Sequence, residues 1–218
     1  MRLPEQVRRI VGFDAKGMRS LGLWVLRRRD GVPPGAIEVT YSRAQSATMM
    51  IMLGMMAVET VAVELLLRAM DVSAWVRLPV LVLDVYGLFI GFAVVAACVT
   101  RPHVVTAGEL RIRYGAFLDV RIPRELITAV RVVRSYNESG LVGVVDDRLT
   151  VVVSSQVNVV VELSEPITIV RPLGRRAEVR KVRFFADAPA VAQSALAVDP
   201  SGGPRRTTGA ASEAGARP

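Results

Sequence analysis

Residues 47–67 read ATMMIMLGMMAVETVAVELLL, and residues 78–100 read LPVLVLDVYGLFIGFAVVAACVT. Each run holds about 20 mainly apolar residues, enough for a helix to cross the roughly 30 Å hydrocarbon core of a bilayer. The alternative is a pair of buried helices, but a 218-residue chain with no other helical hairpin could hardly enclose two such apolar cylinders. The sequence therefore predicts a transmembrane hairpin over residues 47–100, with helices at 47–68 and 78–100.

The composition excludes several classes of protein. Hydrophobic residues make up 51% of the chain and the mean hydropathy is +0.38, values too apolar for an ordinary soluble domain or a disordered chain. Cys98 is the single cysteine and His103 the single histidine, which excludes an internal disulfide framework and a Cys-based or His-cluster metal site. The sequence shows neither a nucleophile–base pair nor a phosphate-binding loop. We therefore expect no enzymatic activity, no cofactor and no metal.

The basic residues are distributed unevenly around the two spans. Nine Arg or Lys residues precede residue 47, two lie in residues 68–77 and seventeen follow residue 100. Because positive residues stay on the cytoplasmic side of a membrane, we expect both termini in the cytoplasm, with Trp75 anchoring the short outer loop. The 28 basic residues include only two lysines, a ratio typical of GC-rich bacterial genomes. The predicted location is the bacterial inner membrane.

Three carboxylates lie within the predicted spans, and each is a candidate functional residue because intramembrane acids are costly. Glu64 and Asp84 lie toward the outer ends, near Arg68 and Arg77, so snorkelling or local pairing explains both. Glu59 lies near the middle of its span with no basic residue within helical reach. Three interpretations of Glu59 stay open: a protonated carboxyl that hydrogen-bonds across a helix interface, a lipid-facing acid, or part of a proton or ion path.

Small residues in the second span favour close helix packing. Gly87 and Gly91 form a GxxxG motif, and Ala93 and Ala97 continue the small residues on the adjacent face. Such residues let two helix backbones approach where no hydrophobic effect drives their association. The motif predicts packing either against the first span or against a second copy of the chain, so a homo-oligomer stays open.

From residue 103 onward the apolar and polar residues alternate, which is typical of strands with one buried face. The expected strands cover residues 104–106, 110–114, 120–122, 127–133, 149–153, 157–163, 167–170 and 179–185. A longer loop is expected over residues 135–147. Short strands at this spacing predict an antiparallel barrel or sandwich. A C-terminal helix, with Asp187 as its N-cap and Pro189 in its first turn, is expected to plug the open end.

Part of this region resembles a known family. The run VTAGELRIRYG at residues 105–115, followed by VRIP at 120–123 and by Ile127, resembles the opening hairpin and Ile-Pro strand of bacterial pleckstrin-homology-like (PH-like) domains. The later NVVVEL at 158–163, and the Asp187-Ala188-Pro189 sequence with its helix, are similar to the same family. The resemblance covers residues 102–198. It implies a seven-strand barrel with a C-terminal helix, often behind a two-helix membrane anchor and usually without enzymatic activity.

The two ends of the chain differ from the rest. In the N-terminal cytoplasmic segment, residues 1–46, Met18, Leu21, Trp24 and Val25 share a helical face that precedes three arginines. This pattern predicts either a short interfacial helix or a surface helix packed on the barrel. Residues 199–218 lack apolar periodicity and are expected to form a disordered tail.

The expected fold class is an α+β membrane protein. Two transmembrane helices precede a cytoplasmic PH-like domain at residues 101–198, a small antiparallel β-barrel of about seven strands capped by a C-terminal helix. The leading functional hypothesis is a non-enzymatic integral membrane protein whose module binds or scaffolds an unidentified protein partner. The alternative is a small oligomeric transport or channel component that uses Glu59. Phospholipid headgroup binding by the strand arginines has less support because acidic residues are interleaved with them, and no nucleic-acid partner is expected.

Overall fold

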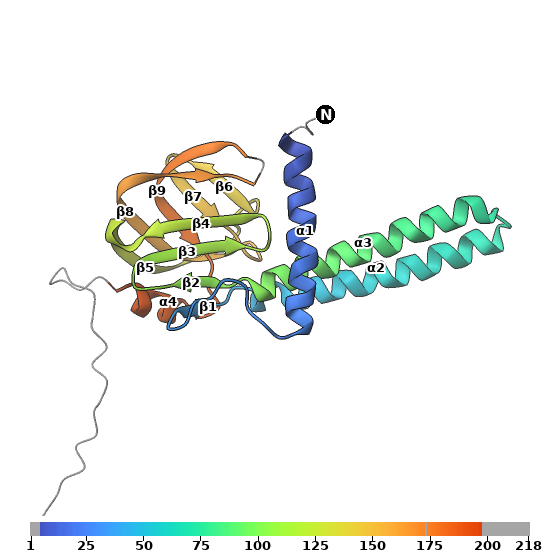
Figure 1. Ribbon diagram of the computed structural model, residues 1–218, viewed down its shortest axis with the longest axis horizontal. Coiled ribbons are helices and arrows are strands. Elements are labelled where there is room, and N and C mark those ends of the chain that lie inside the picture. The colour runs from blue at the N-terminus through green and yellow to red at the C-terminus, as the bar shows by residue number, and fades with distance from the viewer. Residues whose placement is uncertain (1–4, 173, 198–218) are drawn as a thin grey trace, which may run out of the picture.

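The computed structural model describes residues 5–172 and 174–197. These residues form four α-helices, one 3₁₀-helix and nine strands, so the protein is of the α+β class. Two helices form a rod that projects from a body of β-sheets, and the first helix crosses this rod near its base (Figure 1). Val198 and the predicted disordered tail at residues 199–218 lie outside the described residues.

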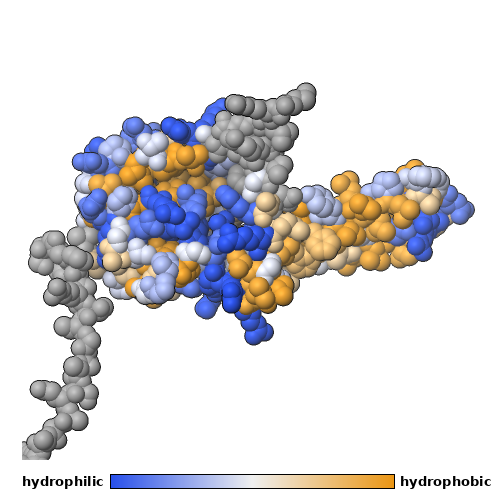
Figure 2. Space-filling model, in the orientation of Figure 1, coloured by the Kyte–Doolittle hydropathy of each residue, from blue (hydrophilic) through white to orange (hydrophobic). Residues whose placement is uncertain are grey.

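Helices α2 (Arg43–Ala69) and α3 (Ala74–Thr100) make the rod, and each has 27 residues. At about 1.5 Å per residue each helix is ~40 Å long, roughly 10 Å longer than a bilayer hydrocarbon core. Both helices are long and apolar enough to cross a membrane. Figure 2 shows apolar surface along the rod and polar surface at its far tip and over much of the β-body. Each helix begins four residues before its predicted span.

Helix α1 (Glu5–Val25) lies across α3 (Figure 1). Gly17 permits close contact between the two helices, because a Cβ placed there would be 3.3 Å from the Cβ of Ala93. Ser20 is buried, and its hydroxyl donates to the Lys16 carbonyl at 2.8 Å. The short helix expected at the N-terminal end is therefore the last part of a longer helix, and it packs on α3 rather than on the β-body.

The first sheet has four antiparallel strands in the order β1-β2-β3-β4. They are β1 (Ile37–Val39), β2 (His103–Val105), β3 (Glu109–Tyr114) and β4 (Leu118–Pro123). Strand β1 precedes the helical rod in the chain and pairs with β2, which follows it, so that Val39 lies opposite His103. The β-body therefore includes residues that precede the predicted range 101–198.

The second sheet has five strands in the order β5-β8-β9-β7-β6. They are β5 (Ile127–Ser135), β6 (Val142–Val145), β7 (Arg148–Val151), β8 (Val157–Val170) and β9 (Arg176–Phe184). Strand β6 lies inside the stretch expected to be a loop. Strand β8 is continuous where two strands were expected, with a register shift against β9 between Glu162 and Ile167. The expectation of a wholly antiparallel fold is wrong at one pair, because β7 runs parallel to β9.

The two sheets share one apolar core but do not join into a closed barrel among the described strands. Strand β4 leads through the 3₁₀-helix Arg124–Leu126 into β5 without pairing to it. The core contains side chains from both sheets, including Ile112, Ile122, Leu149, Val161 and Phe184. Each fully buried aliphatic or aromatic side chain of this kind contributes roughly 1.5–3 kcal/mol, which holds the sheets together without strand pairing between them among the described residues.

Helix α4 (Pro189–Leu196) adds Ala192 and Leu196 to this core. Its N-cap is Ala188, without a side-chain cap bond, so the assignment of Asp187 as the N-cap is wrong. The Asp187 carboxylate instead accepts a hydrogen bond from the Arg43 amide at 3.3 Å. It satisfies a free N–H at the start of α2, where a negative charge complements the helix dipole. Asp187 therefore ties the last strand to the helical rod.

Candidate functional site

The three carboxylates of the rod do not form one site. Glu59 is exposed on the outer surface of α2, and it makes no hydrogen bond or ion pair within the described residues. Glu64 lies between two arginines, 2.7 Å from Arg68 and 3.4 Å from Arg77, so α2 and α3 are joined near the far tip. Asp84 is half-buried on α3. No group of three or more potential metal ligands occurs among the described residues.

The GxxxG face of α3 lies against α2. A Cβ built on Gly91 would be 2.5 Å from Cδ2 of Leu53, and one built on Gly87 would be 3.8 Å from the terminal methyl of Met56. The neighbouring small residue Ala93 faces α1 instead, next to Gly17. Within this structure the small residues of α3 thus serve two contacts inside one chain.

Sequence reasoning missed a buried polar cluster where the rod meets the β-body. We call Tyr41, Gln45, His103, Arg113 and Tyr114 the junction cluster. The rings of Tyr41 and His103 stack with centroids 4.6 Å apart, and Tyr41 and Tyr114 stack at 6.0 Å. The Tyr41 hydroxyl accepts a hydrogen bond from the Gly115 amide at 2.7 Å, and the Tyr114 hydroxyl lies 3.5 Å from Oε1 of Gln45 in α2.

His103 has a structural role in this cluster. Its Nε2 donates to the Phe185 carbonyl at 3.1 Å, and its Nδ1 accepts the Arg113 amide at 3.1 Å. Burial is the main reason why the pKa of His103 falls to about 4, and burial likewise raises the pKa of Tyr41 well above its usual range and that of Tyr114 to about 12. All three groups are therefore neutral near pH 7. Both ring nitrogens of His103 are occupied, so the imidazole has no nitrogen left for acid–base chemistry.

Arg113 fixes the segment that connects α1 to the sheet. The side chain is 1% exposed, and its guanidinium donates to the carbonyls of Asp30 at 2.5 Å and of Gly31 at 2.7 Å. The Asp30 carboxylate in turn accepts the Nε of Arg101 at 2.9 Å. Residues before α2, at the end of α3 and in β3 are therefore held in one arrangement.

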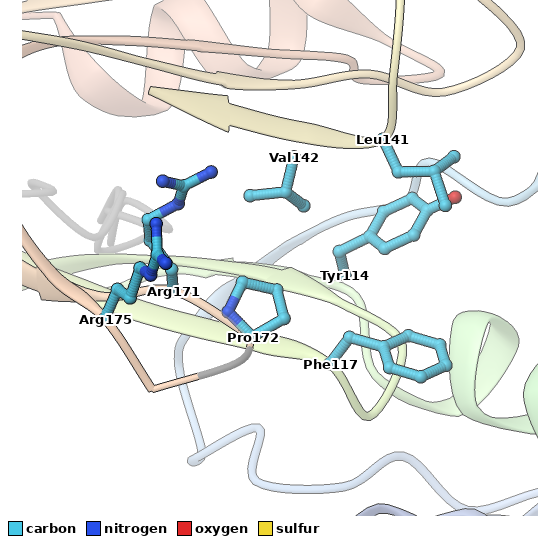
Figure 3. Close-up of a pocket in the computed structure, with 7 residues that line it drawn as sticks. All are labelled: Tyr114, Phe117, Leu141, Val142, Arg171, Pro172 and Arg175. Atoms are coloured by element: carbon cyan, nitrogen blue, oxygen red, sulfur yellow. The ribbon is translucent and has the colours of Figure 1, made fainter. Parts of the chain in front are cut away.

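A cavity of about 760 Å³ opens between the two sheets beside this junction (Figure 3). Its lining residues come from the β3–β4 hairpin, the start of β6 and the β8–β9 turn: Tyr114, Phe117, Leu141, Val142, Arg171, Pro172 and Arg175. Figure 3 shows the two guanidinium groups on one side of the cavity and the aromatic rings with Leu141 on the other. Tyr114 belongs to both the junction cluster and the cavity wall.

The cavity arginines differ from the ion-paired arginines of the sheets. Among the described residues Arg171 and Arg175 make no ion pair, whereas Arg111 donates twice to Asp119, at 2.7 and 2.5 Å. These bonds and the Arg111 charge lower the pKa of Asp119 although burial opposes this. Several strand arginines are paired with acidic residues in this way, whereas Arg171 and Arg175 bring unneutralised charge to the cavity. Other arginines of the second sheet, Arg134, Arg148, Arg176 and Arg180, likewise make no ion pair within the described residues, but they do not line the cavity.

Comparison with family models, curated proteins and solved structures gives no match. The candidate site is therefore defined by its own geometry: an open cavity, apolar on one side and cationic on the other, held against the base of a helical rod. Such a lining can bind an apolar group that carries a carboxylate or another anion.

Proposed function

We propose that this protein is a non-enzymatic membrane adaptor of the bacterial inner membrane. Helices α2 and α3 cross the bilayer, both termini are cytoplasmic, and the β-body is a PH-like module that binds a segment of another protein. Two packed sheets and a terminal helix support the PH-like assignment. The parallel β7–β9 pair departs from the wholly antiparallel barrel that the resemblance implies.

The surface of the rod supports the membrane anchor. The apolar side chains along α2 and α3 are mostly exposed, which a soluble monomer would not tolerate over such an area. Trp75 at the far tip is 90% exposed, a position suited to the outer interface, where indole rings concentrate. Arg68 and Arg77 lie at the same end and hold Glu64, so the charge of Glu64 is compensated there.

The cavity at the junction is the observation that carries the binding proposal. It offers an apolar wall and two arginines without acidic partners among the described residues. A partner segment with one large apolar side chain and a nearby Asp or Glu satisfies both sides, since a desolvated arginine–carboxylate pair gives specificity as well as attraction. The junction cluster holds this cavity in a fixed position relative to the rod, so a partner is received at a defined height above the membrane.

The transport alternative has less support. Glu59 faces outward from the rod, while Glu64 is held by Arg68 and Arg77. A proton or ion path needs polar groups that follow one another across the span. These two carboxylates do not form such a series, because one faces outward and the other is ion-paired.

Site-specific photo-crosslinking tests the adaptor proposal. A photoreactive residue at Leu141, which lines the cavity, should crosslink to a discrete protein, whereas the same residue at Val145, equally exposed at the end of β6, should not. Charge reversal of Arg171 and Arg175 should abolish the Leu141 crosslink, while reversal of the exposed pair Arg176 and Arg180 should preserve it. Crosslinks of equal strength at both positions, or a crosslink that survives loss of the cavity arginines, would contradict the proposal.

A further inference from the structure

The C-terminal end of α1 forms a second cationic site at the base of the rod. Trp24, Val25 and three consecutive arginines, Arg27 to Arg29, line a cavity of about 450 Å³ together with Val99 and Thr100, the last residues of α3. Arg29 is engaged, because its guanidinium donates to the Val99 carbonyl and lies 3.5 Å from Glu38. Arg27 and Arg28 are exposed and have no acidic partner within the described residues.

The backbone at this helix end is strained. The Arg28 amide bonds the Leu23 carbonyl at 2.8 Å and the Arg27 amide bonds the Trp24 carbonyl at 3.0 Å, the two bonds of a Schellman motif. Glycine is the usual residue at the left-handed position of that motif, but here Arg27 occupies it with φ of 52°. A left-handed arginine costs about 1 kcal/mol relative to glycine. Strain of this kind concentrates at binding and catalytic sites.

The position of the cavity along the rod indicates the chemical class of its ligand. Helix α3 is longer than the hydrocarbon core by about 10 Å, so with Trp75 at the outer interface its last turns extend to the level of the inner headgroups. The cavity lies at those last turns, and the exposed side chains of Val25 and Leu26 directly precede its arginines in the chain. Exposed apolar side chains next to unpaired arginines match a surface that is apolar just below its phosphates.

We infer that the cavity of Trp24 and Arg27–Arg29 binds the phosphate of an anionic phospholipid of the inner leaflet. The two unpaired arginines favour an anionic over a zwitterionic headgroup, and Trp24, at 38% exposure, contacts the first acyl carbons. This inference rests on the membrane-spanning part of the proposed function and extends it: the site fixes α1 to the membrane surface and is separate from the protein-binding cavity.

The fluorescence of Trp24 can be used to detect the bound lipid. The chain has two tryptophans, and Trp75→Phe at the exposed far tip leaves Trp24 as the single indole. Full-length protein is reconstituted into vesicles that mix phosphatidylglycerol and phosphatidylcholine, with bromine on the acyl chains of one lipid or of the other. Brominated phosphatidylglycerol should quench the fluorescence of Trp24 more strongly than brominated phosphatidylcholine does at the same mole fraction. The preference of the site for phosphatidylglycerol over phosphatidylcholine should fall about fivefold for each unpaired arginine that is removed, as expected for a cation near an anionic surface.

The matched variants separate binding from folding. Arg27→Gly relieves the backbone strain, so it should leave thermal stability unchanged or higher while it lowers the lipid preference. Adding Arg28→Gln to this variant should lower the lipid preference further. Arg176→Gln with Arg180→Gln removes two exposed charges from β9 and should change nothing. The inference would be overturned if both brominated lipids quenched the Trp24 fluorescence equally, or if Arg27→Gly and Arg28→Gln left the lipid preference intact. It would also be overturned if inorganic phosphate competed more strongly than sodium chloride at equal ionic strength. Absence of quenching by either lipid would instead contradict the membrane anchor, and with it the proposed function.

Discussion

The hydroxyl of Tyr41 accepts a hydrogen bond from the backbone amide of Gly115, with 2.7 Å between oxygen and nitrogen. Tyr41 precedes the helical rod in the chain and Gly115 follows it, so this bond joins the two segments that flank the rod. Gly115 has φ of 49°, and a Cβ built on it would be 3.4 Å from the sulfur of Cys98. The bond therefore fixes the β3–β4 turn against the end of α3 and positions the wall of the junction cavity.

Tyr41→Phe should destabilise the protein by about 1–3 kcal/mol, because it leaves the buried Gly115 amide without its acceptor. The measurement is denaturant-induced unfolding of the full chain in detergent micelles, with strand content followed by circular dichroism. Tyr136→Phe is the control, since Tyr136 is 61% exposed. An equal effect of both substitutions would show that the Tyr41 hydroxyl is not needed.

The pKa of His103, lowered by burial to about 4 from its ordinary 6.5, predicts a loss of stability in mild acid. The unfolded chain binds a proton below about pH 6.5 whereas the folded chain does so only near pH 4, so stability is full above pH 6.5 and falls as the pH drops toward 4. Between pH 7 and pH 5 the free energy of unfolding should decrease by about 2 kcal/mol. His103→Gln should flatten this dependence, and because the chain has no other histidine, an unchanged slope would contradict the assignment.

Gly91→Ala should loosen the rod, because the added Cβ would lie 2.5 Å from Cδ2 of Leu53. Overpacking of this kind costs about 1–3 kcal/mol, and we expect a lower melting temperature in detergent. Gly54→Ala is the matched control on α2, where a Cβ meets nothing within 4 Å. If both alanine variants melted alike, α3 would not pack on α2 through Gly91.

A soluble version of the β-body requires strand β1. A fragment of residues 102–198 lacks β1 and Tyr41, exposes the edge of β2 and should unfold with weak cooperativity. Residues 30–42 joined by a short Gly/Ser linker to residues 101–198 restore both, because Val39 lies opposite His103. Circular dichroism melts should show a cooperative transition for the joined form only. Equal stability of the two forms would mean that β1 is dispensable.

Much of the fold follows from local sequence patterns. The two long helices are indicated by hydropathy alone, and strands β2 to β5 by period-two alternation. The remaining elements depend on contacts between distant segments. Strand β1 has three residues and forms only because β2 provides its partner after the rod, and β6 contains Gly143, which weakens its pattern. The helix expected at Met18–Val25 extends back to Glu5 because α3 provides a surface for Gly17.

The candidate site was harder to predict than the fold. The acids of the two apolar helices stand out in the sequence because charge is rare there, yet Glu59 makes no hydrogen bond or ion pair within the described residues that assigns it a role. Arg171 and Arg175 flank a Pro-Leu-Gly turn that marks only a chain reversal. The cavity that they line also needs Tyr114 and Leu141, which come from two other hairpins, and no local sequence pattern indicates that these residues meet.

The pairing of β1 with β2 also bears on how the protein is made. The ribosome releases β1 first, then the two long apolar helices, and only then the partner strand β2. The first sheet therefore stays incomplete until the helical hairpin has left the exit tunnel. The Tyr41 hydroxyl cannot bond Gly115 until that later segment is made, and the remaining cavity residues, from Leu141 to Arg175, follow later still. A chain stalled before β2 therefore has neither a complete first sheet nor the cavity beside it.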